Sequence, residues 1–266
     1  MKRRQIVLAG AVVAALPGCA LRGRGAPRDY VLVHGSWHGP WCWDKLAALL
    51  REAGHRVSAV DLQGGRAPEQ SNLGTYVKAV TDALDSAAAP AVLVAHSSGA
   101  LAAAQAAEER PERVRSLVLL SAFVAANGES QRSLQGADPA QKVTPVLRVD
   151  FRPGTKIPTQ TRIDTSNPDA VKLAFYNDCS EADAREAIAR LVPEPLAPGG
   201  QPLRLSAERF GRVPKTYIFT ARDNAISPAR QRDYAAKWPL ARSITLDAGH
   251  SPFLSMPREL AAALDA

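Results

Sequence analysis

The chain has 266 residues, 46% of them hydrophobic and 22% charged, and its formal net charge is +7. These proportions are those of a globular protein and exclude a disordered or fibrous one, and the length suits one sizeable α/β domain with an insertion. Three positive charges fall at residues 2–4, inside a first stretch of 18 residues that has no acidic residue. The remaining charge does not gather in a basic run with interleaved aromatic residues, so we expect no nucleic-acid partner.

The first 18 residues have the pattern of a signal peptide. A Lys-Arg-Arg segment at residues 2–4 precedes an apolar stretch at 6–16, which is too short to span a bilayer as an anchor. Paired arginines ahead of an apolar segment are also typical of a twin-arginine signal, which exports a protein after it has folded. We therefore expect residues 1–18 to be a signal peptide and the mature protein to be exported.

Residues 16–19, Leu-Pro-Gly-Cys, are similar to a bacterial lipobox. In a lipobox the cysteine, here Cys19, becomes the lipidated first residue of the mature protein. The sequence thus predicts a periplasmic, membrane-anchored lipoprotein with a tether over residues 19–28 ahead of the folded domain. An ordinary secretory signal with an incidental cysteine is the alternative interpretation.

Strands and helices are predicted to alternate from residue 29 onward. Short apolar runs bounded by turn residues predict strands at residues 30–33, 56–62, 91–95, 114–120, 217–220 and 243–246. Apolar residues at helical spacing predict helices at residues 41–52, 74–87, 100–110, 228–237 and 257–265. Strands that alternate with helices indicate an α/β fold with a parallel sheet covered on both faces.

The alternation breaks between residues 123 and 211, a stretch rich in polar residues and proline. It is too long for a loop in a compact domain, so we expect a lid or cap inserted into the core. The core would then comprise residues 29–122 and 212–266. Within the insertion we expect helical patches at 169–177 and 181–191, and a return linker of proline and glycine residues at 193–200.

Two cysteines follow the predicted signal peptide and tether. Cys42 falls in an apolar helical stretch and Cys179 in the predicted lid, so we expect two separate thiols. Neither C-x-x-C nor H-E-x-x-H is present, and no metal site is indicated.

A short apolar run leads into Ser97, which has Ala95 two residues before it and Gly99 two residues after it. This is the spacing of the nucleophile elbow G-x-S-x-G, with alanine in place of the first glycine. A serine on a strained strand-to-helix turn needs small residues at both places, because the two backbones nearly touch there. Ser98 would have the bulky His96 two residues before it, so Ser97 is the predicted nucleophile.

A serine nucleophile needs a base and an acid that orients the base, because a free hydroxyl is a poor nucleophile. The chain order that accompanies an elbow serine is Ser, acid, His, and His250 is the only histidine after the elbow. Asp223 follows the strand that ends at Thr220, whereas the competing Asp247 lies three residues before His250 at a strand end. We therefore predict a triad of Ser97, Asp223 and His250.

Two backbone N–H groups normally stabilise the oxyanion in such a site. One belongs to the residue after the nucleophile, here Ser98, and the other to a loop after an early strand, here Ser36. Gly35 would let the backbone approach the substrate, and His34 is expected to order this loop.

Residues 31–43, Val-Leu-Val-His-Gly-Ser-Trp-His-Gly-Pro-Trp-Cys-Trp, resemble the start of α/β-hydrolase enzymes related to plant methyl esterases and hydroxynitrile lyases. The elbow, the Asp223 turn and the His250 turn fall where that branch has its triad, and residues 175–179 resemble the lid of its bacterial esterase members. The resemblance covers residues 29–264. It implies the α/β-hydrolase fold: a mostly parallel sheet flanked by helices, with an inserted lid.

Two positions separate esterases from lyases within this branch. The lyases carry a threonine near the place of Gly35 and a lysine directly after the histidine, where this chain has Ser251. Their absence favours hydrolysis of a small ester through an acyl-enzyme intermediate, without a cofactor. The alternative interpretations are a hydroxynitrile-lyase-like, amidase or lactonase activity on the same fold, or a ligand-binding protein on a hydrolase fold.

Overall fold

The computed structural model describes residues 26–134, 136 and 138–265. The predicted signal peptide, Cys19 and most of the predicted tether lie outside the described residues. In the part that is described, no helix is both long and apolar enough to cross a membrane. Cys42 and Cys179 are both buried free thiols, as expected.

A six-stranded sheet forms the centre of the molecule, in the order β2-β1-β3-β4-β8-β9, and every neighbouring pair in it is parallel. Its strands are β1 (Asp29–Val33), β2 (Arg56–Val60), β3 (Ala91–His96), β4 (Val114–Leu120), β8 (Lys215–Thr220) and β9 (Arg242–Leu246). The expected parallel α/β sheet is confirmed, and each strand lies within two residues of its predicted bounds.

Both faces of the sheet are buried, which explains why its central strands are apolar at successive positions. In β3, Leu93 belongs to one core cluster, while Val92 and Val94 belong to the cluster on the other face. Strands that are covered on both faces read as continuous apolar runs instead of alternating patterns. The sheet therefore separates two hydrophobic cores.

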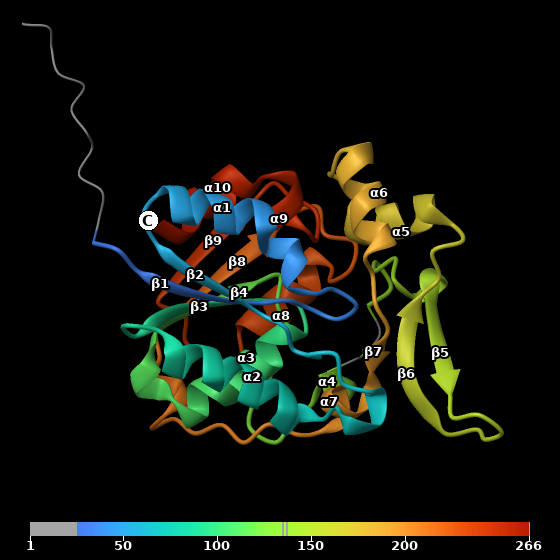
Figure 1. Cartoon of the computed structure of the whole chain (residues 1–266), viewed down its shortest axis with the longest axis horizontal. Helices are drawn as coiled ribbons and strands as arrows, with labels where there is room; N and C mark the ends of the chain where they lie inside the picture. Colours follow the sequence, from blue (N-terminus) through green and yellow to red (C-terminus); the bar gives the residue numbers. More distant parts are fainter. Residues whose placement is uncertain (1–25, 135, 137, 266) are drawn as a thin grey trace, which may run out of the picture.

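Helices cover the two faces (Figure 1). The first face carries α1 (Asp44–Glu52), α9 (Pro252–Ser255) and α10 (Pro257–Asp265), and the second carries α2 (Leu73–Ser86), α3 (Gly99–Glu109) and α8 (Pro228–Ala235). Short 3-10 turns η1 (Pro40–Trp43), η2 (Pro68–Gln70) and η3 (Pro111–Arg113) complete this part. The predicted helix at 41–52 is thus split, because its first turn, which starts at a proline, is a 3-10 turn.

The inserted stretch lies beside the carboxyl ends of the strands (Figure 1). Its elements are α4 (Gln131–Leu134), η4 (Thr144–Val146), β5 (Leu147–Phe151), β6 (Pro158–Ile163), α5 (Pro168–Phe175), α6 (Glu181–Ala189), β7 (Glu194–Pro195), α7 (Leu196–Gly200) and η5 (Phe210–Arg212). Helices α5 and α6 stand where the two helical patches were predicted. We call residues 143–195 the cap.

The antiparallel sheet β5-β6-β7 was not predicted. The prediction of a return linker at 193–200 is wrong, because residues 194–200 form β7 and α7. Pro195 is compatible with β7 because β7 is an edge strand, where a missing N–H costs no ladder hydrogen bond. A two-residue strand containing proline carries no strand pattern to recognise.

The two ends of the insertion pack with the main core. Val124 and Leu134 before the cap, and Leu203 and Phe210 after it, belong to the cluster beneath α2 and α3. The middle of the insertion has a separate cluster of its own around Val171. The cap is therefore a small packed unit on a base that is part of the α/β core.

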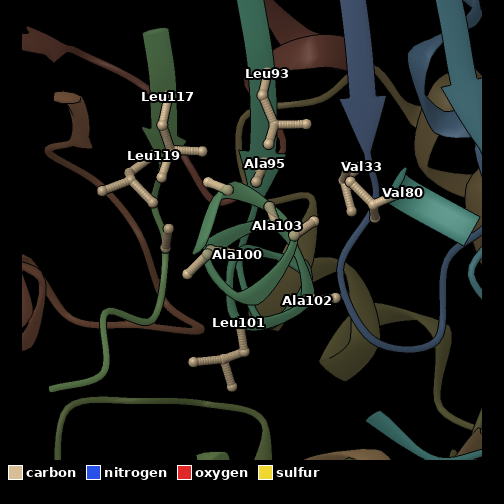
Figure 2. Packing of buried hydrophobic residues seen from close by; sticks show 14 of the residues in the cluster. Val33, Val80, Leu93, Ala95, Ala100, Leu101, Ala102, Ala103, Leu117 and Leu119 are labelled. Carbon is tan, nitrogen blue, oxygen red and sulfur yellow. The ribbon is translucent and has the colours of Figure 1, made fainter. Parts of the chain in front are cut away.

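The turn between β3 and α3 is packed very closely against the end of β1. Figure 2 shows Ala95 at the end of β3 beside α3, with Ala100 and Ala103 on that helix. Gly99 comes so close to the end of β1 that a Cβ there would lie 2.0 Å from the carbonyl oxygen of His34. Only glycine fits at this position.

We expect Gly99→Ala to lower the free energy of unfolding by about 1–3 kcal/mol or more, because backbone atoms must move to accept the methyl group. Gly74→Ala is the control, since a Cβ there would meet only the Asn72 side chain at 3.1 Å, and its effect should stay within about 1 kcal/mol. Urea unfolding followed by circular dichroism measures both. Equal midpoints for the two variants would contradict this account of the turn.

Candidate active site

Ser97 occupies the turn between β3 and α3 in a left-handed conformation, with φ of 52°. Its N–H donates to the Leu120 carbonyl at 3.1 Å, and its own carbonyl accepts from the Phe123 N–H at 3.1 Å. A left-handed conformation is costly for serine and persists only where the surroundings enforce it. The end of β4 therefore holds the strained turn that presents Ser97.

His250 and Asp223 meet on the turns that follow β9 and β8. Nδ1 of His250 lies 2.8 Å from Oδ2 of Asp223, and both side chains are buried. Because the carboxylate can only accept, Nδ1 carries the hydrogen and Nε2 of His250 is the unprotonated nitrogen of the neutral ring. This is the tautomer that a general base requires.

Asp223 is fully hydrogen-bonded. Its Oδ1 accepts from the N–H groups of Ala225 and Ile226 at 2.7 and 2.9 Å. Its Oδ2 accepts from Thr220 Oγ1 at 2.8 Å and from Nε2 of Gln231 at 3.1 Å, besides His250. These donors fix the position of the carboxylate beside His250.

Gln231, on α8, was not singled out from the sequence. It is completely buried, and its amide also binds the Thr220 backbone, so it joins β8 to the turn that carries Asp223. A lone glutamine in an otherwise polar helix gives no sequence signal. By contrast, Asp247 is exposed and pairs with Arg222 at 3.0 Å, away from the imidazole.

Two buried histidines support the elbow and the neighbouring loop. His96 Nε2 donates to the His250 carbonyl oxygen at 2.9 Å, and the two rings pack with centroids 4.5 Å apart. His34 Nε2 accepts from the Leu62 N–H at 3.2 Å, so its Nδ1 donates to the Gly35 carbonyl oxygen at 2.9 Å. Burial lowers the pKa of both imidazoles, which keeps them neutral.

The loop after β1 lies against the elbow. A Cβ on Gly35 would lie 2.8 Å from the Cβ of Ser97, so the glycine is required by the close approach. The Ser36 N–H donates to Oγ of Ser98 at 2.8 Å, and the two hydroxyl oxygens are 2.7 Å apart. One of the two predicted oxyanion donors is therefore occupied by a neighbouring hydroxyl in this structure.

His38 braces the same loop from the other side. Its Nδ1 donates to the Ser36 carbonyl oxygen at 2.8 Å, and its Nε2 accepts from the hydroxyl of Tyr176 at 2.9 Å. Burial lowers the pKa of His38 to about 3, so this ring is a neutral structural link between loop and cap.

A second part of the cap contacts the turns that carry Asp223 and His250. Asp178 accepts from the Gly249 N–H at 2.8 Å, and the Asn177 amide donates to the Arg222 carbonyl oxygen at 2.9 Å. A Cβ on Gly249 would come 2.1 Å from Oδ1 of Asn177. The residues before Asp223 and before His250 are thus both held by one pair of adjacent cap residues.

A pocket of about 440 Å³ opens over the elbow, with Ser97, His250 and Ser36 on its wall. This is the size range of small-molecule sites. The rest of the wall combines apolar side chains with a few polar ones; they include Trp37, Phe123, Phe175, Leu147, Gln131 and Glu194. Among the described residues no group of three histidine, cysteine or acidic side chains could hold a metal ion.

Comparison with known proteins places this geometry in a family. Residues 30–263 match the family described as "Alpha/beta hydrolase family". The chain belongs to this family. The fold expected from the sequence is therefore confirmed.

Relatives and solved structures agree with this assignment. Methylesterase 1 of Arabidopsis thaliana is 30% identical, over 88% of this chain and 93% of its own length. Putative methylesterase 11, chloroplastic, from the same plant is also 30% identical, and the chain spans 61% of its length. The crystal structure of polyneuridine aldehyde esterase superposes with a TM-score of 0.79 at 26% identity, covering 90% of this chain and 98% of that one. The expected carboxylesterase-like character is confirmed at this level.

The geometry predicts which acidic residue matters. Asp223→Asn should lower kcat for a short-chain ester by about 10⁴-fold, because an amide at this place favours the wrong imidazole tautomer. Asp247→Asn makes the same chemical change on an exposed side chain and should leave kcat within about twofold of wild type. Steady-state kinetics of both variants provides the measurement. A similar loss in both, or a loss only in Asp247→Asn, would contradict the assignment.

Proposed function

We propose that this protein hydrolyses a small carboxylic ester through an acyl-enzyme intermediate on Ser97, with His250 as base and Asp223 as the orienting acid. The observation that carries the proposal is the 2.8 Å contact between His250 Nδ1 and Asp223 Oδ2, on the wall of the pocket that also contains the strained Ser97. A structural histidine–aspartate pair would not need to lie beside an elbow serine.

The protons can be followed through the reaction. Nε2 of His250 takes the hydroxyl proton as Ser97 Oγ bonds to the carbonyl carbon, and returns that proton to the departing alcohol. Asp223 stays ionised and stabilises the imidazolium between these steps. A water molecule then repeats the sequence on the acyl-enzyme, which releases the acid and restores the Ser97 hydroxyl.

The N–H groups of Ser36 and Ser98 are the proposed oxyanion donors. Oγ of Ser98 holds the Ser36 N–H at 2.8 Å, so a carbonyl oxygen must displace or share this hydroxyl contact. A hydrogen bond to an oxyanion is roughly twice as strong as one between neutral groups. The exchange therefore becomes more favourable as charge develops on the substrate oxygen, which is where catalysis requires it.

The pocket supports a compact, partly apolar ester. Trp37, Phe123 and Phe175 provide flat apolar walls near Ser97. The names of the relatives, methylesterases among them, make methyl esters the first substrates to test. The lyase alternative has less support. Gly35 has no space for a side chain against Ser97, where the lyases have a threonine nearby, and the residue after His250 is the buried Ser251 instead of a lysine.

A fluorophosphonate probe and a short-chain chromogenic ester test the nucleophile together. Wild type should be labelled and should turn over the ester, whereas Ser97→Ala should be unlabelled and lose at least about 10³-fold in kcat. Ser98→Ala is the matched control, because it removes the adjacent hydroxyl but leaves the nucleophile. It should still be labelled, and labelling that disappears only in Ser98→Ala would move the nucleophile to that residue.

We also propose that the protein is exported and tethered to a membrane through a lipid on Cys19, on the strength of the leader pattern alone. In a bacterial host, wild type should sediment with membranes, while Cys19→Ser should not carry the lipid and should lose this association. Cys179→Ser, which changes a buried cap thiol, should fractionate like wild type. Unchanged sedimentation of Cys19→Ser would exclude the tether.

A further inference from the structure

Trp37, in the loop that carries Ser36, has a backbone conformation that needs outside support. Its φ is 61°, in the left-handed region that a bulky residue rarely adopts. The residue follows directly on a proposed oxyanion donor. Any relaxation of Trp37 would therefore rotate the peptide group beside the Ser36 N–H.

The cap binds all three polar groups of Trp37. The indole N–H donates to Thr161 Oγ1 at 3.1 Å, and the backbone carbonyl accepts from the Val192 N–H at 2.9 Å. The backbone N–H donates to Oε2 of Glu194 at 3.4 Å. The loop that carries Ser36 and Trp37, here called the oxyanion loop, is thus held in its strained form by β6 and by the segment that enters β7.

Glu194 is the ionisable member of this set. Its Oε2 also accepts from Nε2 of Gln63 at 3.2 Å, and its Oε1 accepts from the hydroxyl of Tyr76 at 3.2 Å. All three donors are neutral, and no ion pair in the described part of the chain involves Glu194. Glu194 is partly buried, and it borders both the main pocket and a cavity of about 20 Å³ that Ser36 and Ser98 also line.

We propose that Glu194 is a positioning residue for the oxyanion loop, and that ester hydrolysis is fast only when its carboxyl group is ionised. The inference rests on the proposed function, since it assigns the Ser36 N–H a role in catalysis. Glu194 acts through Trp37 and is not itself required to touch the substrate.

The charge on the carboxyl group decides how firmly it holds Trp37. An ionised carboxylate makes a charge-assisted bond to the Trp37 N–H, which is roughly twice as strong as the bond to a neutral carboxyl oxygen. Burial raises the pKa of Glu194 to about 7, although the bonds from Tyr76, Trp37 and Gln63 act in the opposite direction. The contact is therefore stronger above about pH 7 than below it.

The other groups that pack around Glu194 do not supply a negative charge to the Trp37 N–H in its place. Tyr76 on α2 has a raised pKa through burial and stays a neutral phenol, and His38 in the oxyanion loop is neutral as well. Thr161 on β6 and Gln63 cannot ionise. Nearby charged side chains are Asp61 and Arg66, of opposite sign, in the loop that carries Gln63, and the exposed Glu69 on η2.

The raised pKa has an opposite consequence for stability. The folded state holds the proton of Glu194 more tightly than the unfolded chain does, so the folded protein loses stability as pH rises from the ordinary range of a glutamate through about 7. Ionised Glu194 thus costs stability while it supports the loop. This combination separates a positioning role from a merely structural one.

The test is Glu194→Gln, which keeps the shape and an acceptor oxygen but cannot ionise. kcat for the ester above pH 7 should fall about tenfold with little change in KM, less than the 10²–10³ typical of a lost oxyanion donor. Below about pH 7 this gap should close, because wild type then also carries a neutral carboxyl group at this position. The melting temperature of the variant should exceed that of wild type at pH 8.5, and the difference should shrink at pH 5.5.

Tyr76→Phe is a second, independent variant. It removes a donor that lowers the pKa of Glu194, so the loss of kcat/KM on acidification should begin at a higher pH. Glu186→Gln, on the exposed face of α6, should leave both the pH profile and the melting temperature unchanged.

A difference in activity between wild type and Glu194→Gln that is as large at pH 5.5 as at pH 8.5 would overturn the inference. So would a lower melting temperature of Glu194→Gln at both pH values, because that is the result of a merely structural contact. Failure of the proposed function is recognised separately, since it would leave Ser97→Ala active.

Discussion

The contact between the end of β1 and the start of α3 is the constraint on which the site depends. The His34 carbonyl and the Gly99 Cα approach so closely that no side chain fits between them, and the Ser97 backbone is forced into the left-handed region. This packing brings the loop of Ser36 beside Ser97 before any substrate arrives. The two turns after β8 and β9 then need only to reach the same edge of a parallel sheet, where the carboxyl ends of all strands meet.

The sequence was informative wherever one residue type alone satisfies the geometry. Gly99 and Gly35 at the elbow, and a histidine on the turn after the last strand, are requirements of backbone approach and proton transfer, so they carry a local pattern. The sheet and its helices were predictable for a related reason, since burial on both faces demands apolar runs of recognisable length. In the resulting fold, Asp223 and His250 meet although 27 residues separate them.

The support around the site had no such pattern. Gln231, Asp178 and Glu194 support the site through side-chain hydrogen bonds to groups on other elements of the fold, and many residue types could stand at those positions in another protein. The antiparallel strands of the cap were missed because β7 has two residues and β6 starts at a proline. Tertiary pairing determines their conformation, and local propensity does not.

The double contact made by Asn177 and Asp178 has a consequence for how this fold could diversify. One adjacent pair of cap residues fits against the Gly249 turn and binds the Arg222 carbonyl, so the cap is keyed to the catalytic turns as well as to the substrate space. A cap taken from a relative would have to bring a matching pair with it, or the acid and base would lose a common anchor. Exchange of the cap in this protein is therefore restricted by two hydrogen bonds, whereas single substitutions lining the pocket leave that anchor intact and offer the freer route to new substrates.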